Sequence, residues 1–153
     1  MLLGAALQEL KILQSKLSRL YTLRTDTFNV LENKEVEVEF DKISKEINEL
    51  LNEIRALKVQ IAHTNNTVTL DLDGKTITIQ ELIILISDLR EELYQLGYLK
   101  PRGPVYLGGQ AVEYVPQKKQ DEMAELISEL EERKAELDKI LQARNWSTEL
   151  IES

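Results

Sequence analysis

The chain has no cysteine and a single histidine, His63, among its 153 residues. Without cysteine it can form no disulfide and can offer no thiolate to a metal or a substrate. The sequence pattern around this single histidine supports neither a Ser-His-Asp triad nor a Cys-His catalytic pair. The Glu-x-x-His pattern of di-metal helical bundles is absent because Gln60 stands three residues before His63. We therefore expect a non-enzymatic protein with no metal and no cofactor.

Long apolar runs and long basic clusters are missing as well. The longest purely apolar run is Leu82–Ile86, whereas a membrane-spanning helix needs about 20 such residues. The net charge of −8 opposes binding to a phosphate backbone. Residues 1–13 lack the basic start of a signal peptide and carry Glu9 and Lys11 between their apolar residues. These features predict a soluble cytoplasmic protein that binds no nucleic acid and, in its resting state, no membrane.

The chain does contain heptad patterns of apolar residues. Between residues 43 and 61, isoleucine and leucine recur at alternating gaps of four and three, and Phe40 extends the pattern upstream. Charged and amide side chains fill most of the positions between. This spacing predicts a long helix over Phe40–Asn65 that buries one narrow seam. The seam residues are Ile43, Ile47, Leu50, Ile54, Leu57 and Ile61.

The same reasoning predicts three further helices, over Leu3–Leu31, over Ile79–Leu99 and from near Pro116 onward. The last is placed there because proline suits the first position of a helix. In the first helix, four flanking residues (Leu7, Ile12, Leu23 and Phe28) widen the apolar stripe, which favours a bundle. The inward positions of the three helices are Leu3, Ala6, Leu10, Leu13, Leu17, Leu20, Arg24, Thr27 and Leu31; Leu82, Leu85, Ile86, Leu89, Leu93 and Leu96; and Met123, Ile127, Leu130, Lys134, Leu137 and Leu141.

Short strands are expected at the connections between helices. Alternating β-branched residues flank Asp73-Gly74, which predicts a β-hairpin within residues 67–79. Glu35–Phe40 alternates with period two and is either a short strand or an extended lead into the second helix. It could pair with a strand from the glycine- and proline-rich loop, Pro104–Val115, in which Val112–Val115 is the candidate strand.

These elements predict a mainly α protein of one domain, residues 1–153. The expected architecture is an antiparallel bundle of four long helices in up-down-up-down order, with a small β-hairpin between the second and third helices. A rod with wide apolar stripes needs a neighbour to cover its seams, so we expect a homo-oligomer.

This topology brings two polar helix ends together and gives the one candidate site. Asn65 and Asn66 are expected to end the second helix, and the residues after the fourth helix lie beside them. The candidate residues for a ligand or partner site are His63, Asn65, Asn66, Asn145, Trp146, Thr148 and Glu149. The alternative is structural: the polar residues cap two helix ends, and Trp146 plugs the base of the bundle.

Two of these segments resemble a small, mostly uncharacterised bacterial family, the septicolysin-like proteins. One is Ile61–Asn66 with the threonine-rich stretch and Asp73–Thr76 that follow, and the other is Asn145–Leu150. Order and spacing are similar over most of the chain, although His63 stands where the family commonly has arginine. The resemblance implies a long-helix fold and a homo-oligomer, and it implies no established activity.

Three functions follow from these observations. The first is a non-enzymatic homo-oligomeric helical protein, either structural or an interaction module, whose partner is a second copy or another protein. The second is a chaperone, because two heptad helices joined by a β-hairpin look like a β-type prefoldin subunit. The third is a pore-forming cytolysin, which only the family label suggests. An enzyme stays open only through a site assembled between subunits, with Tyr98, Tyr106 and Tyr114 as its candidates.

Overall fold

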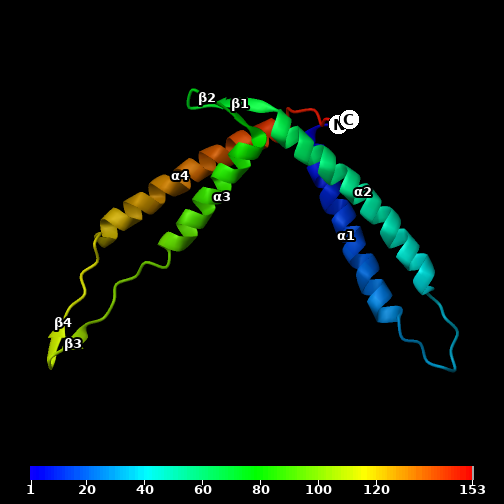
Figure 1. Ribbon diagram of the computed structural model, residues 1–153, viewed down its shortest axis with the longest axis horizontal. Coiled ribbons are helices and arrows are strands. Elements are labelled where there is room, and N and C mark those ends of the chain that lie inside the picture. Colours follow the sequence, from blue (N-terminus) through cyan, green and yellow to red (C-terminus); the bar gives the residue numbers. More distant parts are fainter. Residues whose placement is uncertain (153) are drawn as a thin grey trace. The chain divides into compact units, whose positions relative to one another are not determined.

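Four helices carry most of the chain in the computed structural model, which describes residues 1–152 (Figure 1). They are α1 (Leu3–Thr27), α2 (Phe40–Thr67), α3 (Ile79–Leu96) and α4 (Gln120–Asn145). Two antiparallel hairpins complete the regular structure: β1 (Thr69–Leu72) with β2 (Lys75–Thr78), and β3 (Val105–Leu107) with β4 (Gln110–Val112). The mainly α class is confirmed, while the four-helix bundle with up-down-up-down order stays a prediction.

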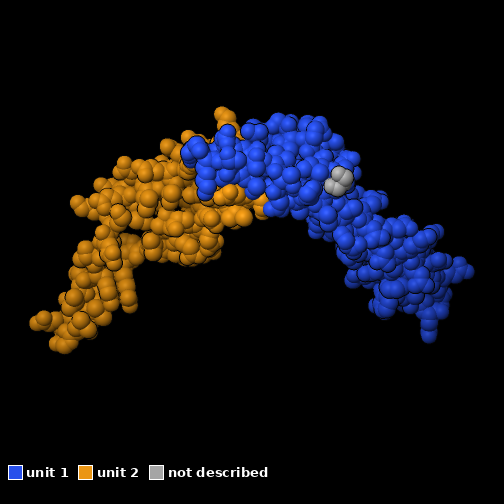
Figure 2. Space-filling model, turned by 45° about the horizontal axis from the view of Figure 1, so that its top comes forward, with its two compact units in different colours: residues 1–79, 143–153 blue, residues 80–142 orange. Residues whose placement is uncertain are grey.

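The chain divides into two compact units, which Figure 2 colours separately. Unit 1 comprises residues 1–79 and 143–153, and unit 2 comprises residues 80–142. Unit 1 is therefore assembled from two stretches of sequence that the whole of unit 2 separates.

Unit 1 is built on α2, whose heptad seam is buried as predicted. Its six apolar seam positions, Ile43, Ile47, Leu50, Ile54, Leu57 and Ile61, are all less than 9% exposed. The partner is α1, which runs antiparallel along α2 (Figure 1). Near the last turn of α1, Arg24 Nη1 donates to Ser44 Oγ in the first turns of α2 over 3.1 Å.

The opposite helix, α1, buries a narrower stripe than predicted. Leu3 and Ala6 are fully buried, the following leucines are partly buried, and the flanking Ile12 and Phe28 are exposed by 66% and 63%. One neighbouring helix covers only one side of a helix, so the flanking residues remain in solvent. The helix also ends at Thr27 and not at Leu31, because its register weakens at Arg24 and Thr27.

The first hairpin agrees with its prediction. Leu72 pairs with Lys75 across the two-residue turn, and Asp73 and Gly74 have φ of 52° and 79°. Positive φ at both turn residues is what a type I′ hairpin requires, and glycine meets it without strain. Leu70 and Ile77, which are paired across the strands, are buried, so this hairpin is anchored by side chains.

The end of α2 differs from its prediction. The helix continues through Asn65 and Asn66 to Thr67, and Val68 then turns to extended backbone while its N–H donates to the Thr64 carbonyl over 2.9 Å. Neither asparagine takes the left-handed conformation. The β-branched Thr67 and Val68 leave the helix for β1 at once, so no left-handed residue is needed to close it.

The remaining connections and the last helix also differ from their predictions. In unit 1, residues 35–39 form no strand, which leaves the alternative of a lead into α2. In unit 2, β3 pairs with β4 around Gly108-Gly109, so the predicted pairing with residues 35–40 is wrong. Of the expected strand Val112–Val115, only Val112 is in β4. The last helix, α4, begins at Gln120 and not near Pro116. Its first turn holds Asp121 and Glu122, whose charges favour a helix N-terminus at that point.

Burial in unit 2 is sparse. On α3 only Leu82 and Ile86 of the predicted seam are buried, and on α4 only Leu137. The other apolar seam residues, Leu85, Leu89, Leu93, Leu96, Met123, Ile127, Leu130 and Leu141, are partly buried.

Candidate functional site

The candidate site lies in unit 1, where residues 145–152 meet the starts and ends of other elements. Asn145 is the last residue of α4, and the chain then turns, with the Ser147 amide donating to the Arg144 carbonyl over 3.2 Å. Ser147 Oγ donates to the Ala143 carbonyl over 2.8 Å. This turn buries Asn145 and Thr148 while Trp146 and Glu149 remain exposed.

Backbone hydrogen bonds join this segment to the N-terminal residues. The Leu3 amide donates to the Thr148 carbonyl, and the Leu150 amide donates to the Met1 carbonyl, each over 2.8 Å. Between them, Leu2 and Glu149 form an antiparallel bridge. We call residues 1–3 together with 148–152 the terminal clasp. The Met1 amine also lies 3.3 Å from Glu149 Oε2, although an ion pair as exposed as this one contributes little stability.

Thr64 connects the terminal clasp to α2. Its hydroxyl, fully buried, donates to the Gln60 carbonyl over 2.8 Å and accepts the Ile151 amide over 2.9 Å. Gln60 Nε2 donates to the Glu152 carbonyl over 3.3 Å. Thr64 is not among the site residues predicted above, although its position in the sequence indicates a structural role. It stands three residues after Ile61, at the next seam position, where a polar residue must find buried partners.

The predicted site residues fall into two groups. Asn65, Asn145 and Thr148 are buried, whereas His63, Asn66, Trp146 and Glu149 are exposed. Asn66 Nδ2 donates to the Ala62 carbonyl within α2 over 2.8 Å. Buried Asn65 Oδ1 has no hydrogen-bond partner among residues 1–152. The structure thus brings the end of α2 to residues 148–152 through Thr64, and His63 faces solvent.

Trp146 packs on α1 and does not plug an interior. A Cβ placed on Gly4 would lie 2.7–2.9 Å from three carbon atoms of the indole ring, so the ring rests directly against the Gly4 backbone. Gly4 is buried, yet Trp146 is 46% exposed. The expectation of a buried plug is therefore wrong. The first turn of α1 lacks a side chain at Gly4, and this accommodates one face of the indole while the other side stays in water.

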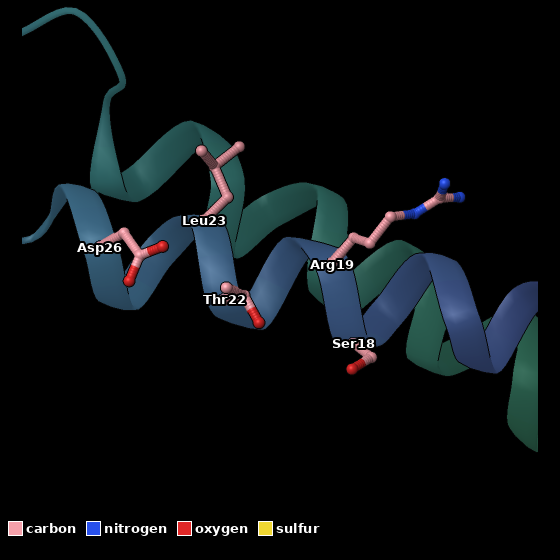
Figure 3. A pocket seen from close by; sticks show the side chains of 5 residues that line it. All are labelled: Ser18, Arg19, Thr22, Leu23 and Asp26. Atoms are coloured by element: carbon pink, nitrogen blue, oxygen red, sulfur yellow. The ribbon is translucent and has the colours of Figure 1, made fainter.

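One surface hollow is formed by residues of α1 alone. It has a volume of about 280 Å³, follows the outer face of α1 and is lined by Ser18, Arg19, Thr22, Leu23 and Asp26 (Figure 3). All five belong to a single helix, so no second element closes over the hollow. Within residues 1–152, no group of three or more His, Cys, Asp or Glu side chains is placed to hold a metal ion. Nor does any described helix combine the length and apolar character that crossing a membrane requires.

One titratable pair lies at the end of α3. Tyr94 and Tyr98 stand edge to face, with ring centroids 5.0 Å apart, and their hydroxyls share a hydrogen bond. That hydrogen bond, followed by desolvation, raises the pKa of the Tyr98 phenol above its ordinary value. Both rings are exposed, by 59% and 63%.

Comparison with known proteins places the chain among proteins of unknown function. Residues 11–150 match the family of unknown function DUF6847. No curated protein matches the chain. A crystal structure described as a functionally unknown conserved protein from Corynebacterium diphtheriae is similar, with a TM-score of 0.81, 21% sequence identity and coverage of 99% of each chain. At that identity, the likeness shows that the two proteins share a fold.

Proposed function

The chain belongs to the DUF6847 family of unknown function, and we propose that it is a non-enzymatic homo-oligomeric helical protein, an interaction module of the cytoplasm. The observation that carries this proposal is the amount of large apolar surface left in solvent where the helices connect. Contiguous exposed apolar patches mark interaction sites far more often than scattered single residues do.

Both units show such surface. In unit 1 it lies on the connection from α1 to α2, where Phe28, Val30, Leu31, Val36 and Phe40 are all at least half exposed. In unit 2 the β3–β4 hairpin has no buried residue, and Leu107 and Val115 are exposed by 61% and 82%. An isolated two-stranded hairpin is at best marginally stable in water, so a partner that covers it would also stabilise it.

The partly buried seams of α3 and α4 support the same proposal. Leucine and isoleucine at heptad spacing stabilise a helix when a facing helix accepts them, and most of these positions in unit 2 are only partly covered. In an assembly, helices of neighbouring copies would cover them as in a bundle. This long-helix homo-oligomer is also what the resemblance to septicolysin-like proteins implies.

Light scattering coupled to size-exclusion chromatography tests the proposal on the full chain from 1 to 100 µM. We expect a mass that is a multiple of the 17.6 kDa chain at the upper end of this range. A constant monomer mass at every concentration would overturn it.

A prefoldin-like chaperone is the second candidate, and one observation favours it. The β1–β2 hairpin joins two heptad helices, α2 and α3, and apolar side chains are exposed where helices connect, available to an unfolded client. We expect such a protein to suppress the aggregation of a thermally unfolding client enzyme in a light-scattering assay. Aggregation that proceeds unchanged at a fourfold excess of the protein would remove this candidate.

A further inference from the structure

The two exposed connections differ in the sign of their net charge. We define the acidic tip as residues 28–41 of unit 1 and the basic tip as residues 98–119 of unit 2. The acidic tip holds five acidic residues and one lysine, a net charge of −4. The basic tip holds four basic residues and one glutamate, a net charge of +3. In a chain of net charge −8, the basic tip is positive against the trend.

We propose that the acidic tip of one copy docks onto the basic tip of another copy, an inference that rests on the homo-oligomer proposed above. Two acidic tips repel each other, and so do two basic tips, whereas an acidic and a basic tip attract. Like-charge repulsion excludes the wrong pairing, and complementary charge speeds encounter and fixes register. Each chain carries both halves of the contact, so a second copy is the occupant that matches both.

The acidic tip offers an apolar centre with a charged rim. Phe28 and Phe40 stand edge to face with centroids 5.8 Å apart, both at least half exposed, and Leu31 is 68% exposed. Arg24 of α1 lies 5.6 Å from the Phe40 ring centroid, so a cation adjoins this aromatic pair. The exposed Glu35, Glu37 and Glu39 follow in sequence and supply the rim.

The basic tip has the matching composition. Its hairpin is free of charge from Gly103 to Val112, and Tyr106 and Leu107 are exposed by 73% and 61%. Arg102 lies over the Tyr114 ring, 4.5 Å from its centroid, so one cation is already fixed beside an aromatic face. Tyrosine and arginine are enriched at protein interfaces because they combine a large apolar area with polar ends. Lys100, Lys118 and Lys119 complete the positive rim.

A contact between two different surfaces is heterologous. Its products are a closed ring, a reciprocal dimer or an open filament, depending on the rotation between copies. The proposal therefore requires both tips of every chain to be competent, and a chain that lacks either tip would act as a terminator.

Charge reversal tests this pairing directly. The first variant is Glu35→Lys/Glu37→Lys/Glu39→Lys, in which both tips are positive. The second is Lys100→Glu/Arg102→Glu/Lys118→Glu/Lys119→Glu, in which both tips are negative. We expect the Kd of self-association of each variant alone to rise at least about tenfold, because like charges then face each other. An equimolar mixture should recover assembly, because each variant then meets the opposite charge.

Matched controls change the net charge equally without touching either tip. They are Glu125→Lys/Glu129→Lys/Glu132→Lys and Lys11→Glu/Lys16→Glu/Lys58→Glu/Lys139→Glu, all at exposed positions. The readout is sedimentation velocity at 50 µM, with circular dichroism to verify helix content. Controls that assemble like the wild type, single reversals that do not, and a mixture that does would support the inference.

Other outcomes separate the two proposals. Wild-type assembly that survives both reversals, or a mixture that fails to recover, would overturn tip-to-tip docking and leave the homo-oligomer standing. Binding of the wild type to an acidic protein partner without self-assembly, or a wild type that stays monomeric, would overturn both.

Discussion

Helices of units 1 and 2 carry the same heptad pattern of apolar residues, but they bury these residues to different extents. Every apolar seam position of α2 in unit 1 is buried, while on α4 in unit 2 only Leu137 is. The spacing of apolar residues predicts that a helix forms and which face is apolar. How much of that face leaves the solvent depends on the neighbour. In unit 1, α1 follows α2 closely, and the terminal clasp holds the start of α1 and the end of α2.

The hairpins repeat this contrast. Both have a two-residue turn with positive φ, at Asp73-Gly74 and at Gly108-Gly109. The β1–β2 hairpin buries Leu70 and Ile77, whereas no residue of β3 or β4 is buried. Turn chemistry is thus sufficient to form a hairpin, and side-chain burial decides whether it contributes to the stability of its unit.

Matched leucine truncations give the largest expected difference between the units. Leu50→Ala removes a side chain that is 5% exposed, and we expect it to lower the free energy of unfolding by about 2–5 kcal/mol. Leu130→Ala, at a partly buried seam position of α4, should cost about half as much or less, since less contact is lost. Urea unfolding followed by circular dichroism at 1 µM measures both. Equal losses would contradict the contrast in burial.

The terminal clasp gives the next effect. Thr64→Val keeps the shape of the side chain but removes the hydroxyl that binds the Ile151 amide and the Gln60 carbonyl. We expect a loss of about 1–3 kcal/mol, since the partly buried Ile151 amide is left without its acceptor. Hydrogen exchange should show faster exchange at Ile151. Thr64→Ser retains the hydroxyl and should protect that amide; unchanged protection in Thr64→Val would argue against the bond.

Gly4 tests the contact of Trp146 with α1. The Cβ added by Gly4→Ala would meet the indole at under 3 Å, so the ring must move. Because Trp146 is 46% exposed it can swing outward, and we expect a cost of about 1–2 kcal/mol. The emission of this single tryptophan should shift to longer wavelength.

The matched control for Gly4 lies in unit 2. At Gly103 a Cβ would meet nothing within 4 Å, so Gly103→Ala should leave the emission unchanged. An unshifted spectrum in Gly4→Ala would show that the ring does not rest there.

The turn glycines give the smallest effect and compare the two hairpins directly. Gly74 and Gly109 have φ of 79° and 80°, where alanine is strained by about 1 kcal/mol. We expect Gly74→Ala to lower the thermal midpoint, since its hairpin carries buried residues. Gly109→Ala should leave the midpoint unchanged and weaken only the cross-strand nuclear Overhauser effects of β3–β4. A lower midpoint in both variants would place the second hairpin in the cooperative structure of the protein.

Much of this fold can be read from the sequence because its signals are local. Ile43 to Ile61 predicted the seam of α2, and Asp73-Gly74 predicted the first hairpin. Predictions that required long-range partners were less successful. Glu35–Phe40 has the alternating pattern of a strand, and the loop Pro104–Val115 was its expected partner. That loop instead forms the β3–β4 hairpin around Gly108-Gly109, because a local turn forms more readily than a pairing of distant segments.

The candidate site shows the same limit. Sequence placed residues 145–149 near the end of α2, and the contacts of residues 148–152 with Thr64, Gln60 and Leu3 agree with that placement. It gave Trp146 the wrong environment, because the space left by Gly4 on a different helix has no signature in the local pattern around the tryptophan. Whether the site binds a ligand stays a prediction.

The discontinuity of unit 1 has a consequence for biosynthesis. Residues 143–152 leave the ribosome after the whole of unit 2, so α1 and α2 are synthesised well before their final backbone partners. Until then Leu3 and Thr64 lack the hydrogen bonds that Thr148 and Ile151 give them in the folded chain. Unit 1 can therefore complete its backbone hydrogen bonds only after residue 151 has been synthesised.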